Sequence, residues 1–227
     1  MIGGTQSYGQ NTNMNSGANQ SNISHYMSSY KNGLMSSMSD LKTLVFSNLN
    51  NLSAGSVDAQ SLADTDVQGR TLFHRAADSS QPGDRMMPSS LKKLNELHPG
   101  LIDQRNNHMG REGEGDTPLL TAINRLEKNG DFINMFTEVG ADVNAKGISG
   151  HTPLIRMIVK RQPVDTVERL LAHGNVDLDV TVPSPSGRDD LNLDWFISHV
   201  RDPEYKESLQ NLIEPYRTPG SEEKAVD

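Results

Sequence analysis

The sequence predicts an all-α fold: a solenoid of three to four stacked helix-turn-helix units, preceded by a disordered N-terminal segment. Three observations lead to this prediction. A Gly-x-Thr-Pro-Leu pattern recurs along the chain, a second helical pattern ending in glycine follows each of the earlier copies, and residues 1–39 differ in composition from the rest. Recurrence at a spacing of some tens of residues is typical of stacked repeats.

The first half of the repeat begins at a glycine each time, and successive glycines lie 46, 35 and 37 residues apart. The four copies are residues 69–77, 115–123, 150–158 and 187–195. Glycine permits the positive φ of a tight turn, and a threonine two residues later can cap a helix. Asp189 takes this capping place in the fourth copy. Proline at the first helical position loses no needed N–H. Each copy therefore predicts a turn followed by a helix.

The second half of the repeat is a helical pattern that ends at a glycine and continues as an extended turn. It occurs at residues 91–103, 132–146 and 167–179. Gly140 and Gly174 stand where a helix ends in a left-handed residue. The two halves recur in the same order, so each unit is predicted to contain two helices.

The pattern resembles the ankyrin-repeat family, whose units carry Thr-Pro-Leu-His-x-Ala and, further on, Gly-Ala-Asp-Val-Asn. The likeness covers roughly residues 64–216 and is strongest at the Thr117 and Thr152 copies. Leu72 replaces the proline of the first copy, and only His74 retains the family's histidine. The fourth copy keeps little beyond its glycine and one leucine, so it is predicted to be a degenerate terminal unit. The alternative is a generic helical bundle with coincidental Thr-Pro-Leu turns.

The ends of the chain differ from this repeat domain. Residues 1–39 contain no Asp or Glu and only one Lys or Arg, and Ser, Asn, Gln, Gly and Met supply most of them, so we expect disorder. Residues 40–63 predict an amphipathic helix, over about 40–53, and a linker. This helix would cap the stack or bind a chaperone or partner. Residues 217–227 are expected to be a disordered tail.

The overall composition limits the classes of function. A net charge of −8 repels phosphate backbones, so nucleic acid is not expected as a partner. The absence of cysteine removes disulfides and thiolate chemistry. No apolar run reaches the roughly 18 residues of a membrane helix, and the N-terminus does not have the pattern of a secretory signal peptide. We expect a soluble, monomeric, intracellular protein without a cofactor.

Several residues could carry chemistry, but each has a simpler structural explanation. His74 is expected to bond to the neighbouring turn, as the family's histidine does. Asp177-Leu178-Asp179 and Asp64-Thr65-Asp66 resemble a metal motif but fall where the repeat normally carries Asp and Asn, so no metal site is expected. The glycine-rich stretch 110–115 lacks the strand and the ending of a phosphate loop. Trp195 is expected to be buried and His151 exposed.

The resemblance implies that the protein binds another protein through its hairpin tips and concave face. The tips mix both charges with exposed apolar residues, which suits a protein partner. The second tip is about six residues longer than the others, and long loops in compact domains are usually functional. The predicted partner-binding residues are Gln68, Arg70, His108, Met109, Arg111, Glu112, Glu114, Lys146, Ile148, Ser149, His151 and Arg188. No catalytic residues are assigned.

The acid-free N-terminal segment also resembles the export signals of bacterial effectors delivered by type III secretion. If the resemblance holds, the protein is made in a bacterial cytoplasm, accompanied by a secretion chaperone, and binds a host protein as a virulence factor. The alternatives are an intracellular anti-activator that sequesters a bacterial regulator and an enzyme of unrecognised type.

Overall fold

The computed structural model describes residues 16–32, 45, 52, 56–78, 88–107, 115–124, 131–187 and 189–217. For residues 16–22, 57, 58 and 131 it describes the backbone alone. This part of the chain is mostly helical, and its strands are limited to one short antiparallel pair.

The elements follow one another as helix pairs joined by turns. Their bounds are α1 Ser16–Lys31, α3 Val57–Ser61, α4 Leu72–Ala77, α5 Pro88–Leu97, the 3₁₀ turn η4 Leu101–Asp103, α6 Pro118–Asn124, α7 Asp131–Val139, α8 Pro153–Lys160, α9 Val164–Ala172, β1 Thr181–Val182, β2 Leu191–Asn192, α10 Leu193–Ser198 and α11 Pro203–Arg217. Strand β1 pairs with β2 so that Thr181 lies opposite Asn192 and Val182 opposite Leu191.

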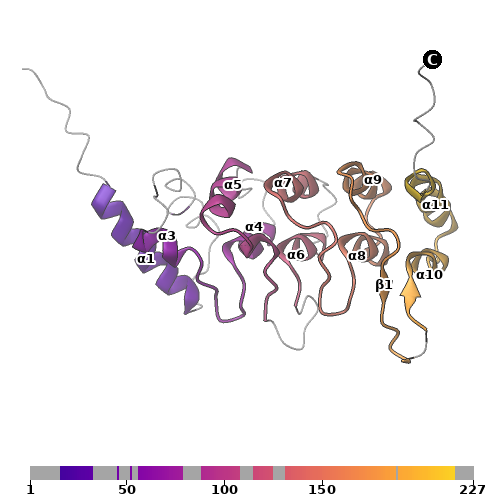
Figure 1. The fold of residues 1–227 in the computed structure, drawn as a ribbon, viewed down its shortest axis with the longest axis horizontal. Helices are drawn as coiled ribbons and strands as arrows, with labels where there is room; N and C mark the ends of the chain where they lie inside the picture. Colours follow the sequence, from indigo (N-terminus) through magenta and orange to yellow (C-terminus); the bar gives the residue numbers. More distant parts are fainter. Residues whose placement is uncertain are drawn as a thin grey trace, which may run out of the picture.

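The helices form two parallel rows (Figure 1). One row contains α4, α6, α8 and α10, and the other contains α5, α7, α9 and α11; within each row every helix packs on the next. Long turns leave the first row on the side away from the second row and project in one direction (Figure 1). The apolar residues buried between the helices form one continuous core that runs from α1 to α11.

Helices α6 and α8 begin in the same way, as the repeated Thr-Pro-Leu pattern predicts. The hydroxyl oxygen of Thr152 accepts a hydrogen bond from the Ile155 N–H at 3.4 Å, and that of Thr117 accepts one from the Leu120 N–H at 3.3 Å. These bonds satisfy N–H groups that a helix start leaves without a partner. The two helices pack directly against each other. Equivalent sequences thus occupy equivalent, neighbouring places.

The glycines that end the second-row helices also have the conformation predicted for them. Gly140 follows α7 with a φ of 102°, and Gly174 follows α9 with a φ of 73°. Both values lie in the left-handed region that favours glycine.

The fourth unit departs from the prediction. Helix α10 is capped by Asn192, whose side-chain oxygen accepts from the Trp195 N–H at 2.9 Å. The predicted cap, Asp189, lies three residues earlier and is exposed. The strand pair β1–β2 lengthens this turn and moves the start of the helix along the chain.

The N-terminal segment also differs from the prediction. Residues 16–31 form α1, so the expectation of disorder is wrong for this part of residues 1–39. Ile23, Tyr26, Met27 and Tyr30 recur at helical spacing, and all four are buried. The Tyr30 hydroxyl donates to the Arg70 carbonyl oxygen at 2.7 Å, which ties α1 to the first unit. Residues 1–15 and 33–39 lie outside the described residues.

The two boundary predictions have different outcomes. The helix expected over residues 40–53 lies outside the described residues except for Val45 and Leu52, both buried. At the other end, Arg217 belongs to α11 and pairs with Asp194, so the prediction that the tail begins at Arg217 is wrong by one residue. Residues 218–227 lie outside the described residues.

Within the part of the chain that the structure describes, no helix is both long and apolar enough to cross a membrane.

Candidate functional site

The projecting turns share one local geometry. In each described tip a glycine N–H donates to the carbonyl oxygen three residues earlier: Gly69 to Asp66 at 2.8 Å, Gly150 to Gly147 at 3.0 Å and Gly187 to Ser184 at 2.9 Å. Gly115 has the same sign of φ, 61°, at the corresponding place in the second tip. The repeated glycine therefore closes the same turn in the first, third and fourth units, and the tips point to one side (Figure 1).

Neighbouring tips also touch one another. The Asn107 N–H donates to the Gln68 carbonyl oxygen at 2.8 Å, and the Lys146 ammonium group donates to the Thr181 carbonyl oxygen at 3.3 Å. A Cβ added at Gly115 would lie 2.8 Å from the Ile148 Cβ. The described tips therefore form a continuous surface.

Two apolar side chains stand out on this surface. Val67, at the first tip, is 73% exposed, and Ile148, at the third, is 65% exposed. Ile148 was predicted as a partner-binding residue. Val67 was not, although it lies in the first predicted tip, two residues before Gly69. Large exposed apolar side chains beside polar groups are typical of contact surfaces.

The predicted residues of the first tip have structural partners. The Arg70 guanidinium pairs with the Asp66 carboxylate at 2.7 Å and the Asp78 carboxylate at 3.4 Å. Gln68 is half-buried, and its N–H donates to the Asp66 carboxylate at 2.9 Å. This tip is therefore held by its own polar network.

The predicted residues of the third tip lie close together in sequence but differ in exposure. Lys146 and Ser149 are exposed, and the Ser149 hydroxyl oxygen accepts from the Arg156 guanidinium at 3.2 Å. His151 is half-buried because its ring packs edge-on against Phe196, with the ring centroids 5.5 Å apart, so the prediction that His151 is exposed is wrong. Burial, and secondarily the Arg156 charge, lowers the pKa of His151.

The remaining predicted partner-binding residues lie outside the described residues. They are His108, Met109, Arg111, Glu112, Glu114 and Arg188.

His74 fixes the second tip to the first unit. Its Nδ1 accepts from the Thr71 N–H at 3.0 Å, so the proton is on Nε2, which lies 3.0 Å from the Asp116 carbonyl oxygen and donates to it. The ring is fully buried, and this burial lowers its pKa to about 4. The histidine is therefore neutral and bonds to the neighbouring turn, as predicted.

Asp116 carries a second link that the sequence analysis missed. Its buried carboxylate pairs with the two terminal nitrogens of Arg156 at 3.1 and 3.3 Å. The Asn124 amide donates to the same carboxylate at 2.5 Å. Burial raises the pKa of Asp116, while the guanidinium and the amide act in the opposite direction. The partners are 40 residues apart in sequence, and no local pattern marks them as a pair.

The aromatic residues of the fourth unit lie partly at the surface. Trp195 is 39% exposed, so the prediction that it is buried is wrong. Phe196 and Ile197 fill the core instead, because the actual cap at Asn192 turns them inward. The Trp195 ring stacks on His199 with the centroids 3.9 Å apart.

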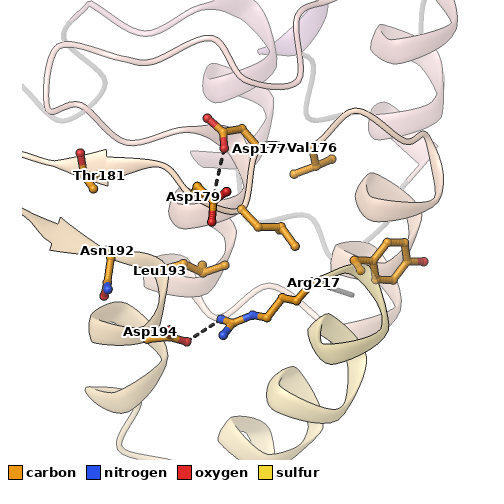
Figure 2. Close-up of a pocket in the computed structure, with 10 residues that line it drawn as sticks. Val176, Asp177, Asp179, Thr181, Asn192, Leu193, Asp194 and Arg217 are labelled. Atoms are coloured by element: carbon orange, nitrogen blue, oxygen red, sulfur yellow. Dashed lines mark hydrogen bonds and ion pairs between the residues drawn. The ribbon is translucent and has the colours of Figure 1, made fainter. Parts of the chain in front are cut away.

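A groove of about 550 Å³ lies between the turn after α9 and the fourth unit (Figure 2). It is lined by Val176, Asp177, Leu178, Asp179, Thr181, Asn192, Leu193, Asp194, Tyr216 and Arg217. Asp177 and Asp179, which resemble a metal motif in sequence, are joined by a bond from the Asp179 N–H to the Asp177 carboxylate at 2.9 Å. Among the residues the structure describes, no group of three acids or histidines is arranged to hold a metal ion.

Comparison with known proteins adds no family assignment. No protein-family model matches the sequence, and no curated protein matches it significantly.

Proposed function

We propose that this chain is an ankyrin-type repeat module that binds a protein partner through its projecting tips and catalyses no reaction. The observation that carries the proposal is the row of equivalent tips, joined to one another, with Val67 and Ile148 exposed at 73% and 65%. The alternation of paired helices with projecting turns also supports it, because stacked repeats commonly present such surfaces to partners.

The polar network beneath the tips supports the same function. The Asp116 carbonyl oxygen accepts a hydrogen bond from His74 of the unit before it. The Asp116 carboxylate pairs with the Arg156 guanidinium of the unit after it. Asp116 is thus held from both sides, and a residue that is already fixed loses less entropy when a partner binds nearby.

The test compares aspartate substitutions at exposed apolar positions. Immobilised full-length chain would be incubated with lysate from the producing cell and, separately, from a candidate host, and captured proteins would be quantified by mass spectrometry. We expect Val67→Asp with Ile148→Asp to reduce capture of a specific protein at least about tenfold, as loss of apolar anchors does. Val159→Asp, at an exposed apolar position near the end of α8, is the matched control.

Full capture by the double variant, or an equal loss in Val159→Asp, would contradict the assignment of the tips. The source of the captured protein separates the two functions considered. A partner from the host lysate supports an effector, and a partner from the producing cell supports an anti-activator.

The acid-free composition of residues 1–39 supports the narrower proposal of an exported effector. Because Ile23 and Met27 are buried against the fold, α1 would have to detach before export. A reporter fused to residues 1–39 tests this; failure of the reporter to enter host cells in a secretion-competent strain would remove export from the proposal.

A further inference from the structure

The turns that follow the second-row helices are joined by a repeating hydrogen bond. The Asp103 carboxylate accepts from the Asp142 N–H at 2.9 Å, and the Asn144 side-chain oxygen accepts from the Asp177 N–H at 2.8 Å. In both cases a side chain of one turn thus accepts a hydrogen bond from a main-chain N–H of the next turn.

Asp179 is the next side chain in this series. The Asn144 N–H bonds to the Asp142 side chain at 2.8 Å, and the Asp179 N–H bonds to the Asp177 side chain at 2.9 Å, so the two turns have the same form. Asp179 lines the groove of Figure 2 and is exposed. No main-chain N–H of the described residues donates to its carboxylate. In the two earlier turns, the equivalent side chains, Asp103 and Asn144, each accept a main-chain N–H from the turn that follows. The groove therefore offers a side-chain acceptor, Asp179, to the main chain of an extended segment.

The charge and the apolar lining of the groove define what this extended chain would carry. Three carboxylates, those of Asp177, Asp179 and Asp194, line the groove together with one guanidinium, that of Arg217, which pairs with Asp194. The chain's own arginine thus shows that a guanidinium is accommodated there. Leu178 and Leu193 are among the apolar lining residues. A volume of about 550 Å³ has room for a few side chains.

We propose that the groove binds an extended, arginine-bearing segment of a partner protein. The segment donates a main-chain N–H to Asp179 and places a guanidinium beside Asp194, where the Arg217 guanidinium lies, while its apolar side chains contact the half-buried Leu178. This inference rests on the proposed function as a protein-binding module and adds a second contact site, with a partner of defined charge.

Charge argues against two other occupants. Residues 218–227 of this chain contain three acids and one lysine, so the carboxylates of the groove repel them. A phosphate-bearing ligand would be repelled in the same way. A basic, extended partner is the occupant that both the hydrogen-bond series and the charge favour.

The probe is an acetylated, amidated peptide of sequence Gly-Val-Arg-Val-Arg-Val-Gly, with a matched peptide in which Glu replaces Arg. Each would be titrated into the ¹⁵N-labelled full chain and followed by NMR. We expect the arginine peptide to shift the amide signals of residues 177–181 and 192–194, and the glutamate peptide to leave them unchanged. Absence of shifts with the arginine peptide, or shifts of similar size with the glutamate peptide, would overturn the proposal.

Substitutions separate the hydrogen bond from the charge. Asp179→Ala removes both and should weaken binding about tenfold. Asp179→Asn should weaken it less, because Asn144 makes the equivalent bond as an amide. Arg217→Gln should strengthen binding severalfold, since the peptide no longer competes for Asp194. Glu207→Gln is the control for Asp179→Asn: it removes the same single negative charge, but on the exposed face of α11.

Loss of binding in Arg217→Gln would contradict the proposal, because it would mean that the peptide guanidinium does not compete with Arg217 for Asp194. Equal weakening by Glu207→Gln and Asp179→Asn would show attraction by net charge alone and would also contradict it. The titration depends on neither Val67 nor Ile148. A failed titration therefore leaves the tip surface standing, and failure of the capture experiment leaves the peptide result standing.

Discussion

Asp116 is the residue at which three units meet. Its carbonyl oxygen accepts from His74 of the first unit, and its carboxylate pairs with Arg156 of the third. The positions equivalent to His74 in the next two units are Leu120 and Ile155, both buried and apolar. The first interface thus uses a histidine and the second an arginine to hold the same tip.

Stability should depend on pH through His74. The neutral ring is favoured in the folded state, where its pKa is about 4, against about 6.5 in the unfolded chain. Between these values the unfolded chain binds more protons, so the free energy of unfolding falls as the pH is lowered. From about pH 7 to about pH 4.5 the loss should be about 2.5 kcal/mol.

Urea unfolding of the parent and of His74→Gln at the two pH values isolates this effect. Other titrating groups, including the half-buried His151, act in both proteins and cancel. When the pH is lowered, the free energy of unfolding of the parent should fall by about 2.5 kcal/mol more than that of the variant. Equal losses would show that His74 titrates normally and that its buried bonds are wrongly assigned.

The Asp116–Arg156 pair should be strongly coupled. Removing either partner leaves a buried charge without its counter-ion. Asp116→Ala and Arg156→Ala should therefore each lower the free energy of unfolding by about 3–5 kcal/mol. The double variant should cost less than their sum by about 1–3 kcal/mol. Arg217→Ala, which breaks an exposed pair with Asp194, should cost less than about 1 kcal/mol. Additive costs in urea denaturation would mean that the buried pair contributes no coupling.

At the scale of elements, the sequence predicted the helix starts and ends that depend only on residues close by in the sequence. The caps at Thr117 and Thr152 and the ends at Gly140 and Gly174 follow from propensities of single positions, and the structure confirms them. The start of α10 could not be predicted in this way, because pairing of β1 with β2 moves it. Tertiary pairing also decides which face of that helix is buried, so the prediction for Trp195 failed with it.

The stacking of the tips can be tested by comparing two glycines with similar φ values. Gly69 has a φ of 68°, and a Cβ there would lie 2.8 Å from the Asn107 backbone nitrogen. Gly174 has a φ of 73° and open space around it. Gly174→Ala should cost about 1–2 kcal/mol from backbone strain alone. Gly69→Ala should cost about 1–3 kcal/mol more, because backbone cannot move aside as a side chain can.

Urea denaturation of the two variants measures the difference. Equal costs would indicate that the first and second tips are not in contact at Gly69.

At the scale of the whole molecule, α1 belongs to the same continuous core as the repeats. The composition of residues 1–39 argued for disorder because few of their side chains are aliphatic. The helical spacing of Ile23, Tyr26, Met27 and Tyr30 was nevertheless visible in the sequence. The groove after α9 was not visible, because it depends on side chains from Val176 to Arg217 that only the fold brings together.

The docking of α1 gives the last prediction. Met27 is fully buried and His25, on the same helix, is exposed. If α1 packs on the first unit, Met27→Ala leaves a cavity and lowers the free energy of unfolding by about 2–5 kcal/mol. His25→Ala should change it by no more than about 0.5 kcal/mol. A disordered segment would make the two substitutions equally harmless in urea denaturation. That result would remove α1 from the core and, with it, the need for α1 to detach before any export.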